Sequence, residues 1–237
     1  MKKLAFTLAE VLITLTVIGV VAAMVLPNLM KHYEKKVLET QTKHFYSMMS
    51  LALHNYMADH KVDDLSDSPL FCEGFEQADG CMRARKEIDS FVMKYLKVAL
   101  KCDDFPNGRT SSTNRCYGNA IWKAISKDAE YASSYTPTHV LMHGYAIDIR
   151  EGWENKTLRI LVDVNGQTSP NRGGRDIWWL WVYEDGTITD IDLTPECKAN
   201  AECVKREADE QFEQCLSNYQ GTGCFAHFKE NGFKFDY

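Results

Sequence analysis

One apolar run dominates the N-terminal part of the chain. It extends over residues 6–26, which is 21 positions, and follows a short segment, residues 1–5, that carries two lysines. At about 1.5 Å per residue, a helix of this length measures roughly 30 Å, close to the thickness of the hydrocarbon core of a bilayer. The pattern predicts a membrane-spanning helix over residues 6–30.

Beyond residue 30 the pattern becomes that of an amphipathic helix. No Gly or Pro occurs between residues 31 and 60, and apolar side chains recur there at roughly helical spacing. These side chains are Val37, Phe45, Met48, Met49, Leu51, Leu53 and Met57. We expect one continuous helix, whose N-terminal half protrudes as an anchor and whose second half covers a sheet.

The middle of the chain changes from helical to strand patterns. Residues 62–118 form a cysteine-containing insertion with a predicted helix from about Met82 to Leu100. Alternating apolar positions then predict an antiparallel meander over residues 137–193. Its strands are expected in THVLM, YAIDI, TLRILVDV, IWWLWVY and TITDI. The sequence therefore predicts an α+β fold, with residues 31–237 forming one globular domain.

The strand IWWLWVY, residues 177–183, has large apolar side chains on both faces. Ile177, Trp179 and Trp181 alternate with Trp178, Leu180 and Val182. We expect the N-terminal helix on one face. The other face would be covered by the insertion or by residues 194–237, a C-terminal cap with a helix in CVKREADEQFEQCL. The alternative is an exposed tryptophan patch that binds a partner.

Charge and motifs exclude several function classes. The chain has 33 Asp and Glu against 27 Lys and Arg, a net charge of -6, which disfavours nucleic acid as a partner. Seven histidines show no HExxH spacing, and the glycine-rich phosphate loop, the G-x-S-x-G elbow and the Ser-x-x-Lys motif are absent from the sequence. We therefore predict that the chain is not an enzyme.

Eight cysteines all lie outside the N-terminal segment, and none forms a CxxC pair. They are Cys72, Cys81, Cys102, Cys116, Cys197, Cys203, Cys215 and Cys224. This pattern favours disulfides in an oxidising compartment over a zinc site or scattered buried thiols. Pairing 72 with 81 and 102 with 116 would close short loops. The last four can pair in three ways that spacing does not rank, and we favour 197 with 203 and 215 with 224.

Three interpretations fit the N-terminal run: a cleaved secretory signal, a plain signal anchor, or a leader whose apolar part stays in the mature chain. Glu10 separates them, because a carboxylate in hydrocarbon costs a few kcal/mol, about 2.5 to 3.5 for Asp on insertion scales. Cleavage after Ala5 would free the α-amino group of Phe6, and this amine in a neighbouring subunit would neutralise Glu10. The carboxylate therefore favours the third interpretation.

The segment AFTLAEVLITLTVIGVVAAMVLPNL resembles the type IV prepilin cleavage and methylation motif, with its short basic leader, Phe6, a Thr-Leu pair and Glu10. Gly19 and Pro27 fall where pilins and type II secretion pseudopilins commonly carry a small residue and a helix-bending proline. Ala5 departs from the family, which usually has Gly there, and both residues are small. The resemblance covers the N-terminal segment alone.

The resemblance implies that a prepilin peptidase cuts between Ala5 and Phe6 at the bacterial inner membrane and that Phe6 is N-methylated. It further implies an extracytoplasmic globular domain and a filament, either a type IV pilus or a type II secretion pseudopilus, formed with other subunits. A second hypothesis is a minor or tip pilin that acts as an adhesin or substrate-binding module. A third, a membrane-anchored extracytoplasmic enzyme, is disfavoured.

One loop offers candidate metal ligands. Between the third and fourth strands of the predicted meander, oxygen donors gather around glycine turns at Asp163, Asn165, Asn171 and Asp176. Such ligands suit calcium, which some major pseudopilins hold in a loop beside their sheet. Asx turns in a proline-fixed loop explain the same residues without metal, and we favour this interpretation. No other cofactor is expected.

Overall fold

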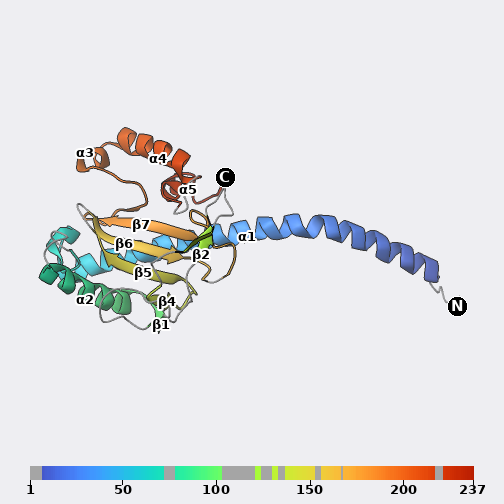
Figure 1. Ribbon diagram of the computed structural model, residues 1–237, viewed down its shortest axis with the longest axis horizontal. Coiled ribbons are helices and arrows are strands. Elements are labelled where there is room, and N and C mark those ends of the chain that lie inside the picture. The colour runs from blue at the N-terminus through green and yellow to red at the C-terminus, as the bar shows by residue number, and fades with distance from the viewer. Residues whose placement is uncertain are drawn as a thin grey trace.

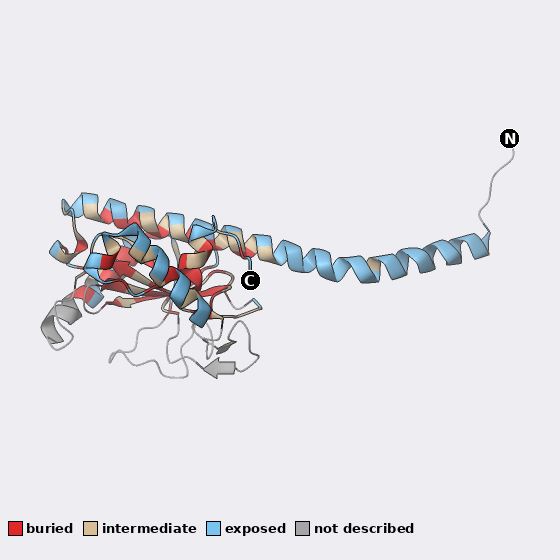
Figure 2. Ribbon diagram, turned by 90° about the horizontal axis from the view of Figure 1, so that it is seen from above, coloured by how far each residue is buried: buried red, intermediate tan, exposed pale blue. Residues whose placement is uncertain are grey.

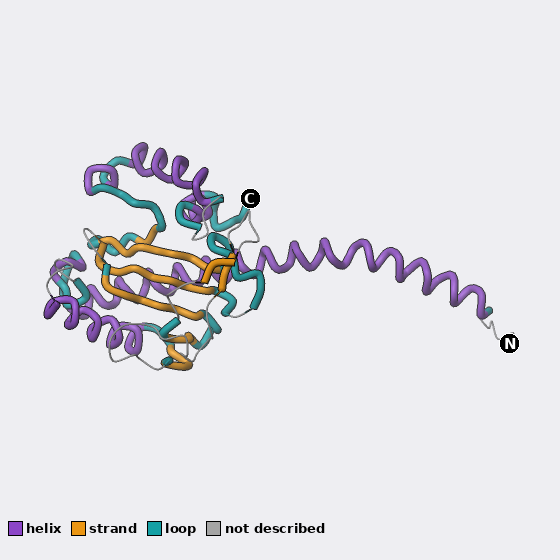
Figure 3. Tube along the Cα trace, in the orientation of Figure 1, coloured by secondary structure: helices purple, strands orange, loops and turns teal. Residues whose placement is uncertain are grey.

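The computed structural model describes residues 7–71, 78–102, 121–123, 130–132, 137–152, 156–166, 168–216 and 221–237. The dominant element is helix α1, Leu8–His60, which is 53 residues long. Its N-terminal half protrudes from the rest of the molecule, and its second half lies along one face of a sheet (Figures 1 and 3). The prediction of one continuous helix with a protruding first half is therefore confirmed.

Burial along α1 changes sharply at Leu38 (Figure 2). From there the buried positions recur in steps of three and four, as one helix face requires. They are Leu38, Thr42, Phe45, Met49, Ala52, Leu53 and Tyr56. Leu51, which the sequence pattern included, points away from the core and is 60% exposed. The helix ends at His60, and the next residue, Lys61, has a φ of 55°, the left-handed conformation common after a helix.

The main sheet has six strands in the order β1-β4-β5-β6-β7-β8, and every neighbouring pair is antiparallel. The strands are β1 Val98–Lys101, β4 His139–Leu141, β5 Ala146–Glu151, β6 Lys156–Asp163, β7 Ile177–Tyr183 and β8 Ile188–Thr189. A separate hairpin joins β2, Ile121–Lys123, to β3, Glu130–Ala132. The meander from β4 to β8 is the one that the sequence predicted, and the α+β class is confirmed.

The predicted helix from Met82 to Leu100 is wrong at its C-terminal end. Helix α2 extends over Ala78–Tyr95, and strand β1 begins at Val98. Strand β1 pairs with β4, with Val98 opposite Leu141. A short apolar run such as VAL fits a helix or a strand equally well, and here the unpaired edge of β4 supplies hydrogen bonds that favour the strand. The insertion therefore contributes an edge strand to the sheet.

The core lies between α1 and the sheet. Each central strand turns alternate side chains toward the helix: Ile147 and Ile149 from β5, Leu158, Ile160 and Val162 from β6, and Trp178, Leu180 and Val182 from β7. The indole Nε1 of Trp178 donates to the hydroxyl of Thr42 on α1 at 3.1 Å. Helix α2 adds Phe91 and Val92 to the same core, and the short 3-10 helix Leu65–Asp67 adds Leu65. The expectation that α1 covers one face of IWWLWVY is confirmed.

The C-terminal residues wrap around the β7–β8 edge of the sheet. They form α3 Pro195–Lys198, α4 Ala201–Cys215 and α5 Cys224–Glu230. From α5, Phe225 and Phe228 pack on Trp178, on the α1 side. On the opposite face Tyr183 joins a second cluster with residues of α3 and α4, beside the partly buried Trp181. The cap thus contacts both faces at this edge.

A buried carboxylate holds the cap at the end of β8. The side chain of Asp190, just after β8, is buried and accepts hydrogen bonds from the backbone N–H groups of Gly223, Phe225 and Ala226 at 2.7, 2.7 and 2.9 Å. Gly223 has φ of 95°, and a Cβ there would lie 2.3 Å from the carbonyl oxygen of Gln211, so only Gly fits. A disulfide between Cys215 and Cys224 joins α4 to α5 within the cap.

The structure also joins Cys197 to Cys203, so both disulfides of the cap are the pairs favoured from the sequence. Cys102 is disulfide-bonded as well. The expected partners of Cys81 and Cys102, which are Cys72 and Cys116, lie outside the described residues.

Candidate functional site: the protruding half of the N-terminal helix

The protruding half of α1 is an apolar surface without cover from the described part of the chain. Its large apolar side chains between Leu8 and Met30 are 41 to 79% exposed. Soluble monomers rarely expose contiguous apolar patches larger than a few hundred Å². The segment is long and apolar enough to cross a membrane. Such a surface is typical of a helix that is surrounded by lipid or by other protein.

The apolar side chains point to all sides of this half. Exposed members occur at consecutive positions, such as Leu12 and Ile13, or Val20 and Val21, so no polar stripe divides the surface. A helix that is apolar all round is one that is buried in lipid or among other helices. The apolar run ends near Lys31 and Tyr33, which are exposed and are residue types that suit a membrane interface.

Glu10 has a partner within its own chain. Thr7 is the N-cap of α1, and its backbone N–H and its hydroxyl each donate to a Glu10 carboxylate oxygen at 2.8 Å. In return the Glu10 backbone N–H donates to the Thr7 hydroxyl at 3.3 Å. This is a capping box, whose Thr-x-x-Glu signature is present in the sequence. This partner differs from the predicted one, which is an amine in another subunit.

The capping role of Glu10 can be tested separately from the pairing with an amine that the sequence predicts. As a cap it needs a side-chain oxygen, which Gln supplies as well as Glu. As the partner of an amine in another subunit it needs the negative charge, which Gln lacks. Thr7 keeps its backbone N–H after a cut between Ala5 and Phe6, so the two roles are compatible. Ala5 and Phe6 themselves lie outside the described residues.

Gly19 and Pro27 lie within this half of the helix. A Cβ built on Gly19 meets no heavy atom within 4 Å in the described part of the chain. Gly costs up to about 1 kcal/mol relative to Ala inside a helix, and no contact within the described chain offsets this. Pro27 lacks the N–H that would bond to the carbonyl one turn earlier, a common cause of helix bending, and this half of α1 curves (Figure 1).

The candidate calcium loop is organised by hydrogen bonds of its own. The Asp176 carboxylate accepts from the backbone N–H groups of Asn171 and Arg172 at 2.7 and 2.6 Å. Asp163 accepts from the backbone N–H of Asn165 at 3.1 Å. The bond at Asp163 is an Asx turn, and Asp176 accepts from N–H groups four and five residues earlier in the chain. Hydrogen bonds within the chain thus account for the positions of both carboxylates.

Two carboxyl groups in this loop have raised pKa values, which a bound cation would lower. Burial, and then the neighbouring Asp176 carboxylate, raise the pKa of Asp163 to about 8. Burial raises the pKa of Asp176 to about 6, against the hydrogen bonds from Arg172 and Asn171. The side-chain oxygen of Asn165 is buried without a hydrogen-bond partner in the described chain. Two close acids therefore share a site of low polarity.

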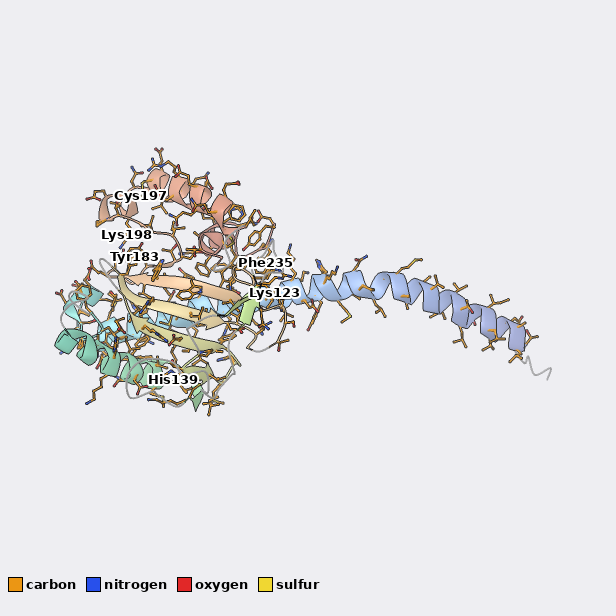
Figure 4. All side chains as sticks on the ribbon, in the orientation of Figure 1. Lys123, His139, Tyr183, Cys197, Lys198 and Phe235 are labelled. Atoms are coloured by element: carbon orange, nitrogen blue, oxygen red, sulfur yellow. A yellow bond between two sulfur atoms is a disulfide. The ribbon has the colours of Figure 1, made fainter. Side chains whose placement is uncertain are left out.

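A second group of potential ligand atoms lies in the cap. The Cys197 and Cys203 sulfurs and a Glu207 carboxylate oxygen lie within 4.8 Å of one another. Both sulfurs belong to the disulfide, so no thiolate is available to a metal. Cys197 lies beside Lys198 and Tyr183 at the end of the cap (Figure 4), and the Lys198 ammonium stands 4.6 Å from the centre of the Tyr183 ring. These contacts attach the cap to β7.

Comparisons with protein-family models, with curated proteins and with solved structures find no match for this chain.

Proposed function

We propose that this chain is a structural subunit of a type IV pilus or a type II secretion pseudopilus. In this proposal residues 6–30 hold it in the bacterial inner membrane, with the globular domain outside the cytoplasm. A prepilin peptidase cuts between Ala5 and Phe6 and methylates the new N-terminus. The apolar helices of many subunits then pack together, and the chain acts through assembly, without catalysis.

The observation that carries the proposal is the continuity of α1. Its first half is apolar on all sides, and its second half is part of the domain core from Leu38 onward. A simple membrane tether needs no fixed geometry between anchor and domain. One unbroken helix fixes the domain relative to the anchor, so helices packed side by side would place their domains in a regular array. This is the geometry that a helical filament requires.

Gly19 and Glu10 support the same proposal. Small residues on apolar helices allow neighbouring helices to approach closely. Gly19 would serve this purpose in a filament, whereas no described residue of its own chain packs against it. The Glu10 carboxylate faces the end of the helix where the amine of Phe6 would be created, and a charge pair there is strong because the surroundings exclude water.

The test separates the capping role of Glu10 from its charge. Glu10→Gln keeps the capping oxygen and removes the charge, whereas Thr7→Val removes the cap and keeps the charge. Incorporation is measured as the amount of subunit in sheared, cross-linked filaments, relative to its amount in the membrane. We expect Glu10→Gln to lower incorporation about tenfold or more, the equivalent of about 1.4 kcal/mol. Thr7→Val should lower it only a few-fold.

Equal incorporation of Glu10→Gln and the unaltered chain would show that the charge has no role in assembly. The carboxylate would then be explained by the capping box alone, and a membrane tether would describe the segment better. Membrane levels of both variants must match that of the unaltered chain, since this excludes a defect in insertion.

A minor or tip subunit is the second candidate. It is favoured by the cap, because α3 and α4 lie beyond the edge of the sheet and add bulk that a repeating subunit would have to accommodate (Figure 1). Immunogold labelling decides between the two. Label along the whole filament supports a major subunit, and label confined to the end supports a tip subunit.

A further inference from the structure

Two histidines that are far apart in the sequence face each other on the surface. His44 belongs to α1, and His143 lies in the tight turn between β4 and β5. Their ring centres are 4.7 Å apart, with an angle of 54° between the ring planes. Both residues are exposed. The pair thus forms a contact between α1 and the β4–β5 turn at the protein surface.

A buried tyrosine orients one of the two rings. The hydroxyl of Tyr145 lies 2.8 Å from Nδ1 of His44, and the Tyr145 ring is fixed edge-on against Phe45 in the core. When Nδ1 donates its proton to this hydroxyl, the lone pair of His44 is on Nε2 and is available to a ligand. Histidines that bind metals commonly donate their other N–H to a carboxylate, a backbone carbonyl or a water, which fixes the tautomer and the ring. The Tyr145 hydroxyl is in the same position relative to His44.

The spacing of the rings matches two ligands on one ion. Zinc binds imidazole nitrogen at about 2.0 to 2.1 Å, and the ring centre lies roughly 1.1 Å further along the same line. Two imidazoles on one ion therefore place their centres about 4.5 Å apart at a right angle and about 5.2 Å apart at the tetrahedral angle. The observed 4.7 Å lies between these values.

We propose that His44 and His143 form a binding site for a divalent transition-metal ion, with Zn²⁺ as the preferred ion and Tyr145 as the positioning residue. Imidazole is a preferred ligand of this ion. Two protein ligands leave the remaining positions to water. The ion would link α1 to the β4–β5 hairpin and would stabilise the edge of the sheet where β1 is added. This site is separate from the loop at Asp163.

The test uses the full chain in detergent, purified without a histidine tag and stripped with EDTA. Zn²⁺ is titrated by calorimetry, and the melting temperature is followed in parallel. We expect one Zn²⁺ per chain and a rise in Tm of roughly 5 to 10 °C when free Zn²⁺ is about 100 times Kd. His44→Gln and His143→Gln should each weaken binding at least tenfold, and Tyr145→Phe about tenfold.

His54→Gln is the matched control, because His54 is exposed on the same helix, and it should bind Zn²⁺ as the unaltered chain does. Three results would overturn the proposal: no binding by the unaltered chain, equal binding after His44→Gln and His143→Gln, or binding that is lost only in His227→Gln. The last result would assign the ion to His227 and Asp236, which are 2.9 Å apart in the cap.

Discussion

Replacing Asp190 with Ala should loosen the start of helix α5 from the sheet. Asp190 is 1% exposed, and its carboxylate is the acceptor for three backbone N–H groups at 2.7 to 2.9 Å. A buried donor that loses its acceptor costs about 1 to 3 kcal/mol. Three donors lose their acceptor, and water that enters the space replaces part of these hydrogen bonds. We therefore expect the free energy of unfolding to fall by roughly 3 to 6 kcal/mol. This is a large part of the 5 to 15 kcal/mol typical of a folded domain.

The assay is urea unfolding of the full chain in detergent, followed by tryptophan fluorescence, because Trp178 packs against Phe225 and Phe228 of α5. Hydrogen exchange should also become faster at the amides of Gly223, Phe225 and Ala226. Asp209→Ala, an exposed change on α4, is the control and should stay within about 0.5 kcal/mol. A loss below about 1 kcal/mol for Asp190→Ala would refute this explanation of how the cap is attached.

Three further predictions concern the core, the cap and the candidate calcium loop. Thr42→Val leaves the indole N–H of Trp178 without its acceptor and should cost about 1 to 3 kcal/mol in the same urea assay; no change would mean that the bond is dispensable. Replacing Cys215 and Cys224 together with Ser should cost about 2 to 3 kcal/mol, because a short loop is released in the unfolded chain, and an unchanged midpoint would contradict this. Asp163 has a folded pKa of about 8, above its unfolded value, so the folded state binds the extra proton and stability should fall as pH rises from about 4 to about 8. Asp163→Asn should flatten that slope, and calcium should leave the Tm of the unaltered chain unchanged; a calcium-dependent rise in Tm that Asp163→Asn abolishes would instead show that the loop holds the ion.

The long helix and the meander could be predicted from the sequence because both follow from simple periodicity. The chain has no Gly from residue 20 to 60, and its single Pro there, Pro27, lies within α1 without ending it. In IWWLWVY the alternation placed Trp178 and Trp179 on opposite faces, as the structure has them. The two disulfides of the cap agree with the preference for near neighbours.

The remaining features depend on contacts between distant parts of the chain. Strand β1 exists because β4 offers an open edge, which the sequence of residues 98–101 does not reveal. Asp190 appears in the sequence as the end of a strand, and only the fold brings the start of α5 to it. His44 and His143 have no motif spacing, since the hairpin turn meets α1 only in three dimensions. The capping box at Glu10 is different, because its local signature was present in the sequence.

The mature N-terminus tests the central claim most directly. Intact-mass and N-terminal peptide analysis of the chain isolated from cells that contain a prepilin peptidase should show loss of residues 1–5 and an N-methylated Phe6. The same chain from cells without the peptidase should keep all five residues. Retention of Met1 in the presence of the peptidase, or a mature start after Ala22 or Ala23, would contradict the account.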